Sequence, residues 1–98
     1  GVLNNYAYNL SLDRKNLKKA EKMSRKSLEA EPDNASFLDT YGYILYLRKD
    51  YENAKVYLKK AIVHGGNNNK DVLYHYALVL EALGEKELAD FYMNKSQK

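Results

Sequence analysis

One apolar pattern recurs three times along the chain, and this repetition limits the folds that the sequence can adopt. The pattern is Leu-x2-Tyr-small-x2-Leu, and its copies begin at Leu3, Leu38 and Leu73. Positions i, i+3, i+4 and i+7 lie on one face of an α-helix, so each copy predicts an amphipathic helix. Recurrence at a fixed period is typical of repeat proteins, in which each unit covers the apolar face of its neighbour.

A second helical stretch follows each copy of the pattern after a polar break. In the central unit the two stretches occupy residues 38–47 and 51–62, with Gly42 and Ala54 inside them. Small residues at these places let two antiparallel helices approach closely, so we predict a helical hairpin. The alanine of the second stretch recurs at Ala20, Ala54 and Ala89, which gives spacings of 34 and 35 residues.

A helix–turn–helix unit of about 34 residues with a small residue in each helix resembles the tetratricopeptide repeat. The resemblance covers nearly the whole chain. It implies an all-α fold, a right-handed superhelix of three helical hairpins with six helices. It also implies one domain that is a segment of a longer protein, residues 1–98, with repeats at about 1–32, 33–66 and 67–98.

The first unit departs most from the family pattern. Ser24 stands where the other units have Leu58 and Met93, and the first turn contains one additional residue. We expect helices at about 3–12, from Asn16 to about 30, from Asp33 or Asn34 to about 47, at 51–62, at about 70–83 and from 85 onward. Asx side chains favour helix starts, so we predict N-caps at Asn16, at Asp33 or Asn34, and at Asp50. Pro32 prevents continuation of the second helix, and Gly65 can adopt the positive φ that ends the fourth.

Composition narrows the class of protein further. The chain has ten tyrosines, two phenylalanines and neither tryptophan nor cysteine. Without cysteine, disulfides and thiolate metal sites are excluded. No apolar run approaches the roughly 20 residues of a membrane span. The style of the helices resembles that of long bacterial repeat proteins, some of which are exported, so cytoplasmic and exported (periplasmic or cell-envelope) locations both remain open.

By the resemblance, one side of each first helix lines the concave inner surface of the array, where these proteins bind peptides. The residues at these places are Asn4, Tyr8, Asp39, Tyr43, Tyr46, Tyr74 and Leu78, with His75 beside them. Ser11 and Glu81 continue the i, i+4, i+7 lines on their helices. We predict that this tyrosine-rich surface binds a protein or peptide partner. The alternative is that the tyrosines pack between adjacent first helices.

Two other binding functions have weaker support. Some family members hold a chaperone's C-terminal carboxylate with fixed cations, but of the matching positions here only Asn4 agrees, so we expect no such clamp. A basic stripe on the second helix could bind nucleic acid or another polyanion, through Lys15, Lys18, Lys22 and Arg25. The net charge of only +3, and the absence of interleaved aromatic residues, favour a solvated helix face instead.

The remaining features of the sequence are the two histidines and the polar end of the last helix. His64 and His75 lie on different predicted helices, and no metal-ligand spacing, phosphate loop or catalytic triad order accompanies them. The last helix is polar at its end but retains Leu88 and Phe91, which leaves a patch where a homodimer could form.

We therefore expect a non-catalytic protein-interaction scaffold without a metal or cofactor. Its predicted partner is a peptide or protein segment on the tyrosine-rich surface. The alternatives are a structural segment of a longer superhelix without a ligand of its own, and polyanion binding through the basic helix at 14–26.

Overall fold

The computed structural model describes residues 2–11 and 16–98. Within these residues the chain forms six α-helices and one short 3-10 helix. In order they are α1 (Val2–Ser11), α2 (Leu17–Ala30), α3 (Ala35–Leu47), α4 (Tyr51–Val63), η2 (Gly66–Asn68), α5 (Lys70–Ala82) and α6 (Lys86–Ser96). The predicted helices are confirmed, and their observed ends agree with the expected ones to within two residues.

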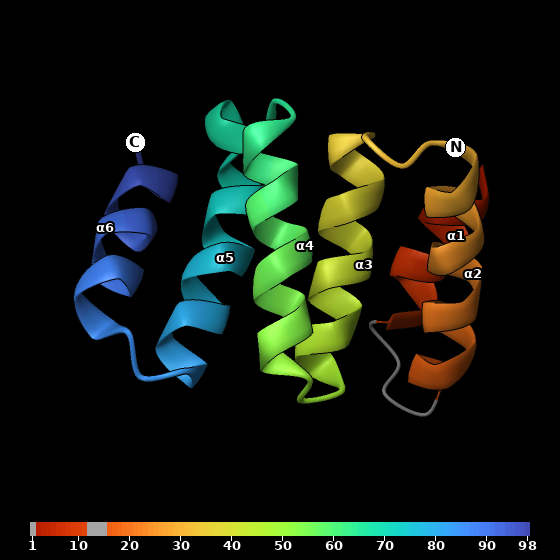
Figure 1. Ribbon diagram of the computed structural model, residues 1–98, viewed down its shortest axis with the longest axis horizontal. Helices are drawn as coiled ribbons and strands as arrows, with labels where there is room; N and C mark the ends of the chain where they lie inside the picture. The colour runs from red at the N-terminus through yellow and green to blue at the C-terminus, as the bar shows by residue number, and fades with distance from the viewer. Residues whose placement is uncertain (1, 12–15) are drawn as a thin grey trace.

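The helices pair as three hairpins, α1–α2, α3–α4 and α5–α6, and each hairpin packs against the next one in sequence. Figure 1 shows the hairpins side by side along the longest axis, with α1 and α2 at one end and α6 at the other. The principal extents are 33 × 26 × 20 Å. This arrangement confirms an all-α helical repeat.

The central hairpin closes around Gly42, as the small-residue pattern predicted. A Cβ atom added at Gly42 would lie 2.6 Å from Cγ of Leu58 and 3.3 Å from its backbone nitrogen. Leu58 belongs to α4 and is fully buried, so it has little room to move away. Glycine at this position therefore lets α3 and α4 approach more closely than any larger residue would.

The predicted N-caps are confirmed only in part. Asn34 caps α3, because its Oδ1 accepts a hydrogen bond from the Phe37 backbone N–H at 3.1 Å. Asp50 occupies the N-cap position of α4 without capping it, and Asn16 likewise makes no side-chain cap on α2. Both have backbone dihedrals outside the extended region that aims an N-cap side chain at the first turn. The Asp50 carboxylate instead accepts a hydrogen bond from Nδ2 of Asn53 at 2.9 Å.

The segment between α4 and α5 has regular structure of its own. Gly65 has a φ of 111°, which confirms the predicted end of α4, and η2 follows directly. Asn69 then caps α5, with its Oδ1 accepting from the backbone N–H of Asp71 at 2.9 Å. The sequence analysis assigned no cap here, although an Asn before a helical pattern is a common capping signal.

The hydrophobic core runs through the hairpins and across their junctions. Its main cluster contains residues of α2, α3, α4, α5 and α6. A smaller cluster joins the first two hairpins, where Ile44 of α3 packs with Ala7 of α1 and Ala20 of α2. The first helices of the second and third hairpins are therefore covered on two sides, by their own second helix and by the preceding hairpin.

Candidate protein-interaction surface

A ladder of aromatic rings crosses the first helices of the three hairpins. The ring centroids of Tyr8 (α1) and Tyr43 (α3) are 6.3 Å apart. Tyr43 stacks on the imidazole of His75 (α5) at 4.1 Å and 21°, and His75 lies 6.1 Å from Tyr74. We call the set Tyr8, Tyr43, Tyr46, Tyr74 and His75 the tyrosine face. The structure thus brings together five of the residues that the sequence assigned to the inner surface.

His75 is the buried member of the tyrosine face. Its side chain is buried, and Nδ1 lies 2.8 Å from Oδ1 of Asp39 on α3, which is itself mostly buried. The hydrogen bond fixes the plane of the imidazole, and the imidazole in turn holds the ring of Tyr43. Burial leaves His75 and Asp39 little surface for direct contact with a partner.

Tyr46 extends the face along α3, one turn beyond Tyr43. Its ring stacks on Tyr43 at 6.1 Å and 19°, and it lies 5.7 Å from Tyr51 at the start of α4. Burial raises the pKa of the Tyr46 phenol, and the neighbouring Tyr51 and Tyr43 act in the same direction. The phenol therefore stays neutral over the physiological range and acts as a hydrogen-bonding group at the edge of an apolar surface.

The tyrosine rings differ in exposure. Tyr8, Tyr43 and Tyr46 are half-buried, whereas Tyr74 is 45% exposed. Tyr43 touches rings of both neighbouring first helices, so it combines the two roles that the sequence left open. It packs between helices and still presents part of its surface to solvent.

One of the residues expected on this surface contributes little to it. Asn4 is only 3% exposed, and its Oδ1 is buried without a hydrogen-bond partner among the described residues. Its position on α1 corresponds to that of Asp39 on α3, whose carboxylate faces the next first helix. Leu78 is half-buried on α5, and the side chain of Ser11 lies outside the described residues. We leave Asn4 out of the proposed surface because it has almost no accessible area.

The charges of the surface are acidic or neutral. The residues assigned to it include Asp39 and the exposed Glu81 but neither Lys nor Arg. The basic residues of the predicted stripe lie on α2, where Lys18, Lys22 and Arg25 are exposed, while Arg14 and Lys15 fall outside the described residues. This helix also carries Glu21, whose carboxylate pairs with Arg25 at 3.2 Å and with Arg48, the residue after α3, at 2.9 Å.

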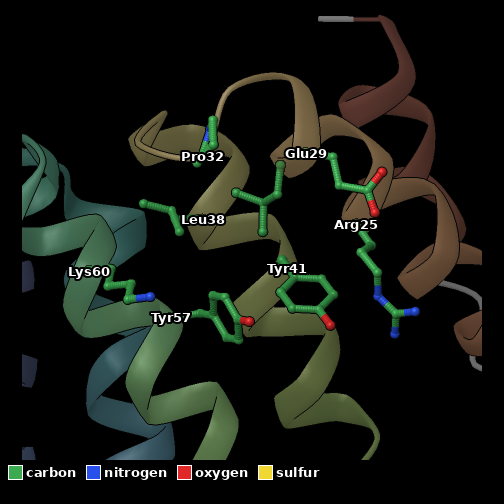
Figure 2. A pocket seen from close by; sticks show the side chains of 8 residues that line it. Arg25, Glu29, Pro32, Leu38, Tyr41, Tyr57 and Lys60 are labelled. Carbon is green, nitrogen blue, oxygen red and sulfur yellow. The ribbon is translucent and has the colours of Figure 1, made fainter.

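Sequence reasoning missed a cavity between the first two hairpins. It has a volume of about 320 Å³ and is lined by residues of α2, α3 and α4 and by Pro32. Figure 2 shows the rings of Tyr41 and Tyr57 beside one another in it, with Arg25 on the α2 side and Lys60 on α4. The two rings meet edge to face at 4.7 Å. None of the lining residues belongs to the tyrosine face.

Other kinds of site find no support in the part of the chain that the structure describes. No helix there combines the length and apolar character needed to cross a membrane. The described residues also contain no group of three or more His, Asp or Glu side chains arranged to hold a metal ion. His64, at the end of α4, lies 3.5 Å from Asp33 in an exposed pair.

Comparison with known proteins agrees with the repeat architecture. The profile of the family described as anaphase-promoting complex, cyclosome, subunit 3 matches residues 13–94. The chloroplastic PsbD mRNA maturation factor Nac2 of Chlamydomonas reinhardtii is 36% identical over 70 residues, which is 71% of this chain. The chain spans 5% of the length of that relative.

These matches bear on two of the sequence-based expectations. The expectation of a bacterial protein gains no support, because the curated relative comes from a green alga. The resemblance to tetratricopeptide repeats is confirmed, because the matched family is of this type and the curated relative contains such repeats. The chain belongs to the tetratricopeptide-type repeat family described as anaphase-promoting complex, cyclosome, subunit 3.

Proposed function

We propose that the chain is a non-catalytic protein-interaction scaffold that binds an extended or helical segment of a partner protein across the tyrosine face. The family supports a scaffold role in general terms. The observation that carries the finer proposal is the ring ladder from Tyr8 through Tyr43 and His75 to Tyr74, which spans all three first helices. Tyr combines a stiff apolar ring with a polar tip, which suits a recognition surface.

The chemistry of the face favours a partner segment that carries Arg or Lys. Tyrosine rings attract cations placed over their faces. The exposed carboxylate of Glu81 adds a negative charge at one edge, and no Lys or Arg in the assigned set repels a cation. A segment with basic side chains spaced along it could place one cation over each exposed ring. An acidic segment would find no charged partner there.

Nucleic-acid binding through α2 is a second candidate, because the curated relative is named as an mRNA maturation factor. The exposed Lys18, Lys22 and Arg25 supply positive charge for phosphates. Glu21 opposes it, since its carboxylate pairs with both Arg25 and Arg48. For that reason, nucleic-acid binding has weaker support than peptide binding.

Two labelled peptides of equal length test the proposal. One carries three Arg residues at alternate positions in an Ala-Ser background, and the other carries Glu at the same positions. We expect the Arg peptide to bind more tightly, and Tyr74→Ala to weaken its binding by about tenfold or more, equivalent to at least about 1.4 kcal/mol. Tyr6→Ala is the matched control, because Tyr6 is similarly exposed (49%) but lies outside the tyrosine face.

The outcomes separate the two candidates. Preference for the Glu peptide, or equal losses for Tyr74→Ala and Tyr6→Ala, would contradict recognition by the tyrosine face. A labelled single-stranded RNA of mixed sequence tests the second candidate under the same conditions. If that RNA binds with a steep salt dependence that Lys22→Ala reduces, α2 is the functional surface instead.

A further inference from the structure

The cavity between the first two hairpins has walls that suit a small apolar ligand. Its volume of about 320 Å³ lies at the lower end of the range of roughly 300–1,000 Å³ that is typical of small-molecule sites. Leu28 of α2, and Leu38 and Tyr41 of α3, line it and are largely buried. The half-buried ring of Tyr57 on α4 meets Tyr41 edge to face. These walls can receive an apolar group about the size of one aromatic ring.

The turn before α3 leaves this cavity open, whereas the equivalent turn before α5 packs closely. Gly66 lies 34 residues after Pro32 and is buried. A Cβ atom added at Gly66 would be 2.9 Å from Cγ1 of Val72 on α5, so the turn there contacts the next first helix. Pro32 is exposed and lies on the rim of the cavity. The opening therefore arises from the residues of this junction.

Two cations flank the tyrosine rings of the cavity. Figure 2 shows Arg25 on one side of the rings and Lys60 on the other. Arg25 is already paired with Glu21 at 3.2 Å. Lys60 forms no ion pair with a carboxylate of the described residues, and its Nζ lies 5.4 Å from the centroid of the Tyr57 ring. With Glu29, the lining contains two positive charges and one negative charge.

We propose that this cavity binds a small organic anion that carries one aromatic ring and one carboxylate. The ring packs against Tyr41 and Tyr57, and aromatic pairs of this kind are favourable. The carboxylate pairs with the ammonium of Lys60, which has no other carboxylate to pair with among the described residues. The single surplus positive charge matches one carboxylate. A phosphate monoester, with about two negative charges at neutral pH, would be opposed by Glu29.

Nuclear magnetic resonance titrations with phenylacetate and its neutral amide, phenylacetamide, test the proposal. We expect phenylacetate to cause saturable shifts of the backbone amide signals of Tyr57 and Lys60, and phenylacetamide to bind about threefold or more weakly. Lys60→Gln should weaken phenylacetate binding by about threefold or more, and Lys60→Arg should restore it. Lys59→Gln is the matched control, because Lys59 is exposed and adjacent but does not line the cavity.

Three results would overturn the proposal. They are an absence of saturable shifts at the cavity residues, equal affinities for the acid and the amide, and equal losses for Lys60→Gln and Lys59→Gln. Lys60 is exposed, so its substitution should leave the fold intact, and a thermal melt of each variant verifies this. Tyr74→Ala should leave phenylacetate binding unchanged, since Tyr74 does not line the cavity. The test is therefore independent of peptide binding by the tyrosine face.

Discussion

Two surfaces expose aromatic rings, but for different reasons: the α1 stripe, which consists of Val2, Leu3 and Tyr6, and the tyrosine face. Tyr6 of the α1 stripe and Tyr74 of the tyrosine face have nearly the same exposed fraction, 49% and 45%. The counterparts of Tyr6 in the other hairpins, Tyr41 and Tyr76, are buried. One position of the first helices, in contrast, is half-buried in every hairpin, where it holds Tyr8, Tyr43 and Leu78.

This difference in exposure between equivalent positions of the repeats distinguishes two kinds of partner. A residue that is exposed only where a neighbouring hairpin is lacking is suited to another hairpin. A residue that stays partly exposed in every hairpin is available after stacking is complete, and such a row is suited to a ligand. Exposure alone does not distinguish the two cases, whereas comparison between the repeats does.

The largest expected effect concerns the stripe positions. Leu38→Ala should destabilise the protein by about 2–5 kcal/mol, because Leu38 is buried between hairpins and its loss leaves a cavity. Leu3→Ala at the same position of α1 should cost less than about 1 kcal/mol, because Leu3 already contacts water. Urea denaturation measures both. Similar losses at the two positions would mean that the α1 stripe is covered in solution.

The next largest effect concerns packing inside the central hairpin. Its size serves as a reference for the losses of stability expected at the two surfaces. Gly42→Leu should destabilise the protein by about 1–3 kcal/mol, because even a Cβ atom would lie 2.6 Å from Cγ of the buried Leu58. Ser36→Leu, at an exposed position of the same helix, is the control and should change stability by less than about 0.5 kcal/mol. A more stable Gly42→Leu protein would rule out the close approach of α3 and α4.

A smaller effect is expected within the tyrosine face. Tyr43→Ala should cost about 1–2 kcal/mol, because its ring contacts both Tyr8 and His75. Tyr74→Ala should cost less than about 0.5 kcal/mol, since its ring is much more exposed. Thermal melts would contradict this account if Tyr74→Ala proved as costly as Tyr43→Ala.

The smallest expected effect is a pH dependence of the stability that arises from Tyr76 and Tyr46. Burial raises the pKa of Tyr76, the buried counterpart of Tyr6, and that of Tyr46 on the tyrosine face. Below the ordinary tyrosine pKa of about 10, both phenols are protonated in the folded and unfolded states, and their contribution to stability is fully present. As the pH rises further, the unfolded state loses protons first, so the free energy of unfolding falls.

Urea midpoints between about pH 9 and 11.5 measure this decline. Tyr76→Phe removes one of the two groups and should make the decline shallower. A decline that is unchanged in both Tyr76→Phe and Tyr46→Phe would assign it to other groups.

The features that sequence reasoning predicted depend on local signals. Helical periodicity and the small residues Gly42 and Ala54 report on one hairpin at a time, so the hairpins and most helix ends were predictable. The burial of Asn4 and the bond between Asp39 and His75 depend on how adjacent first helices are set against each other. That register is a property of tertiary packing, which no spacing within a helix shows.

The absence of a side-chain cap at Asp50 and the cavity beside Tyr41 illustrate the same limit. Residue type favours Asp as an N-cap, but the backbone before α4 turns its carboxylate toward Asn53. The cavity is formed by side chains from three helices and the turn at Pro32, none of which forms a motif in the sequence. Positions whose role depends on more than one hairpin are the ones that require the structure.

Hydroxyl-radical footprinting of Tyr6 and Tyr74 tests the distinction between the two surfaces most directly. The same mass-spectrometric measurement is made on the 98-residue protein and on an extended chain in which a copy of residues 34–71, the α3–α4 hairpin, precedes Val2. We predict that the extension lowers the reactivity of Tyr6 several-fold, because a helix now covers the α1 stripe, and leaves that of Tyr74 unchanged. If Tyr6 stayed fully reactive, or if Tyr74 became protected to the same degree, the two surfaces would not differ in the way that the structure indicates.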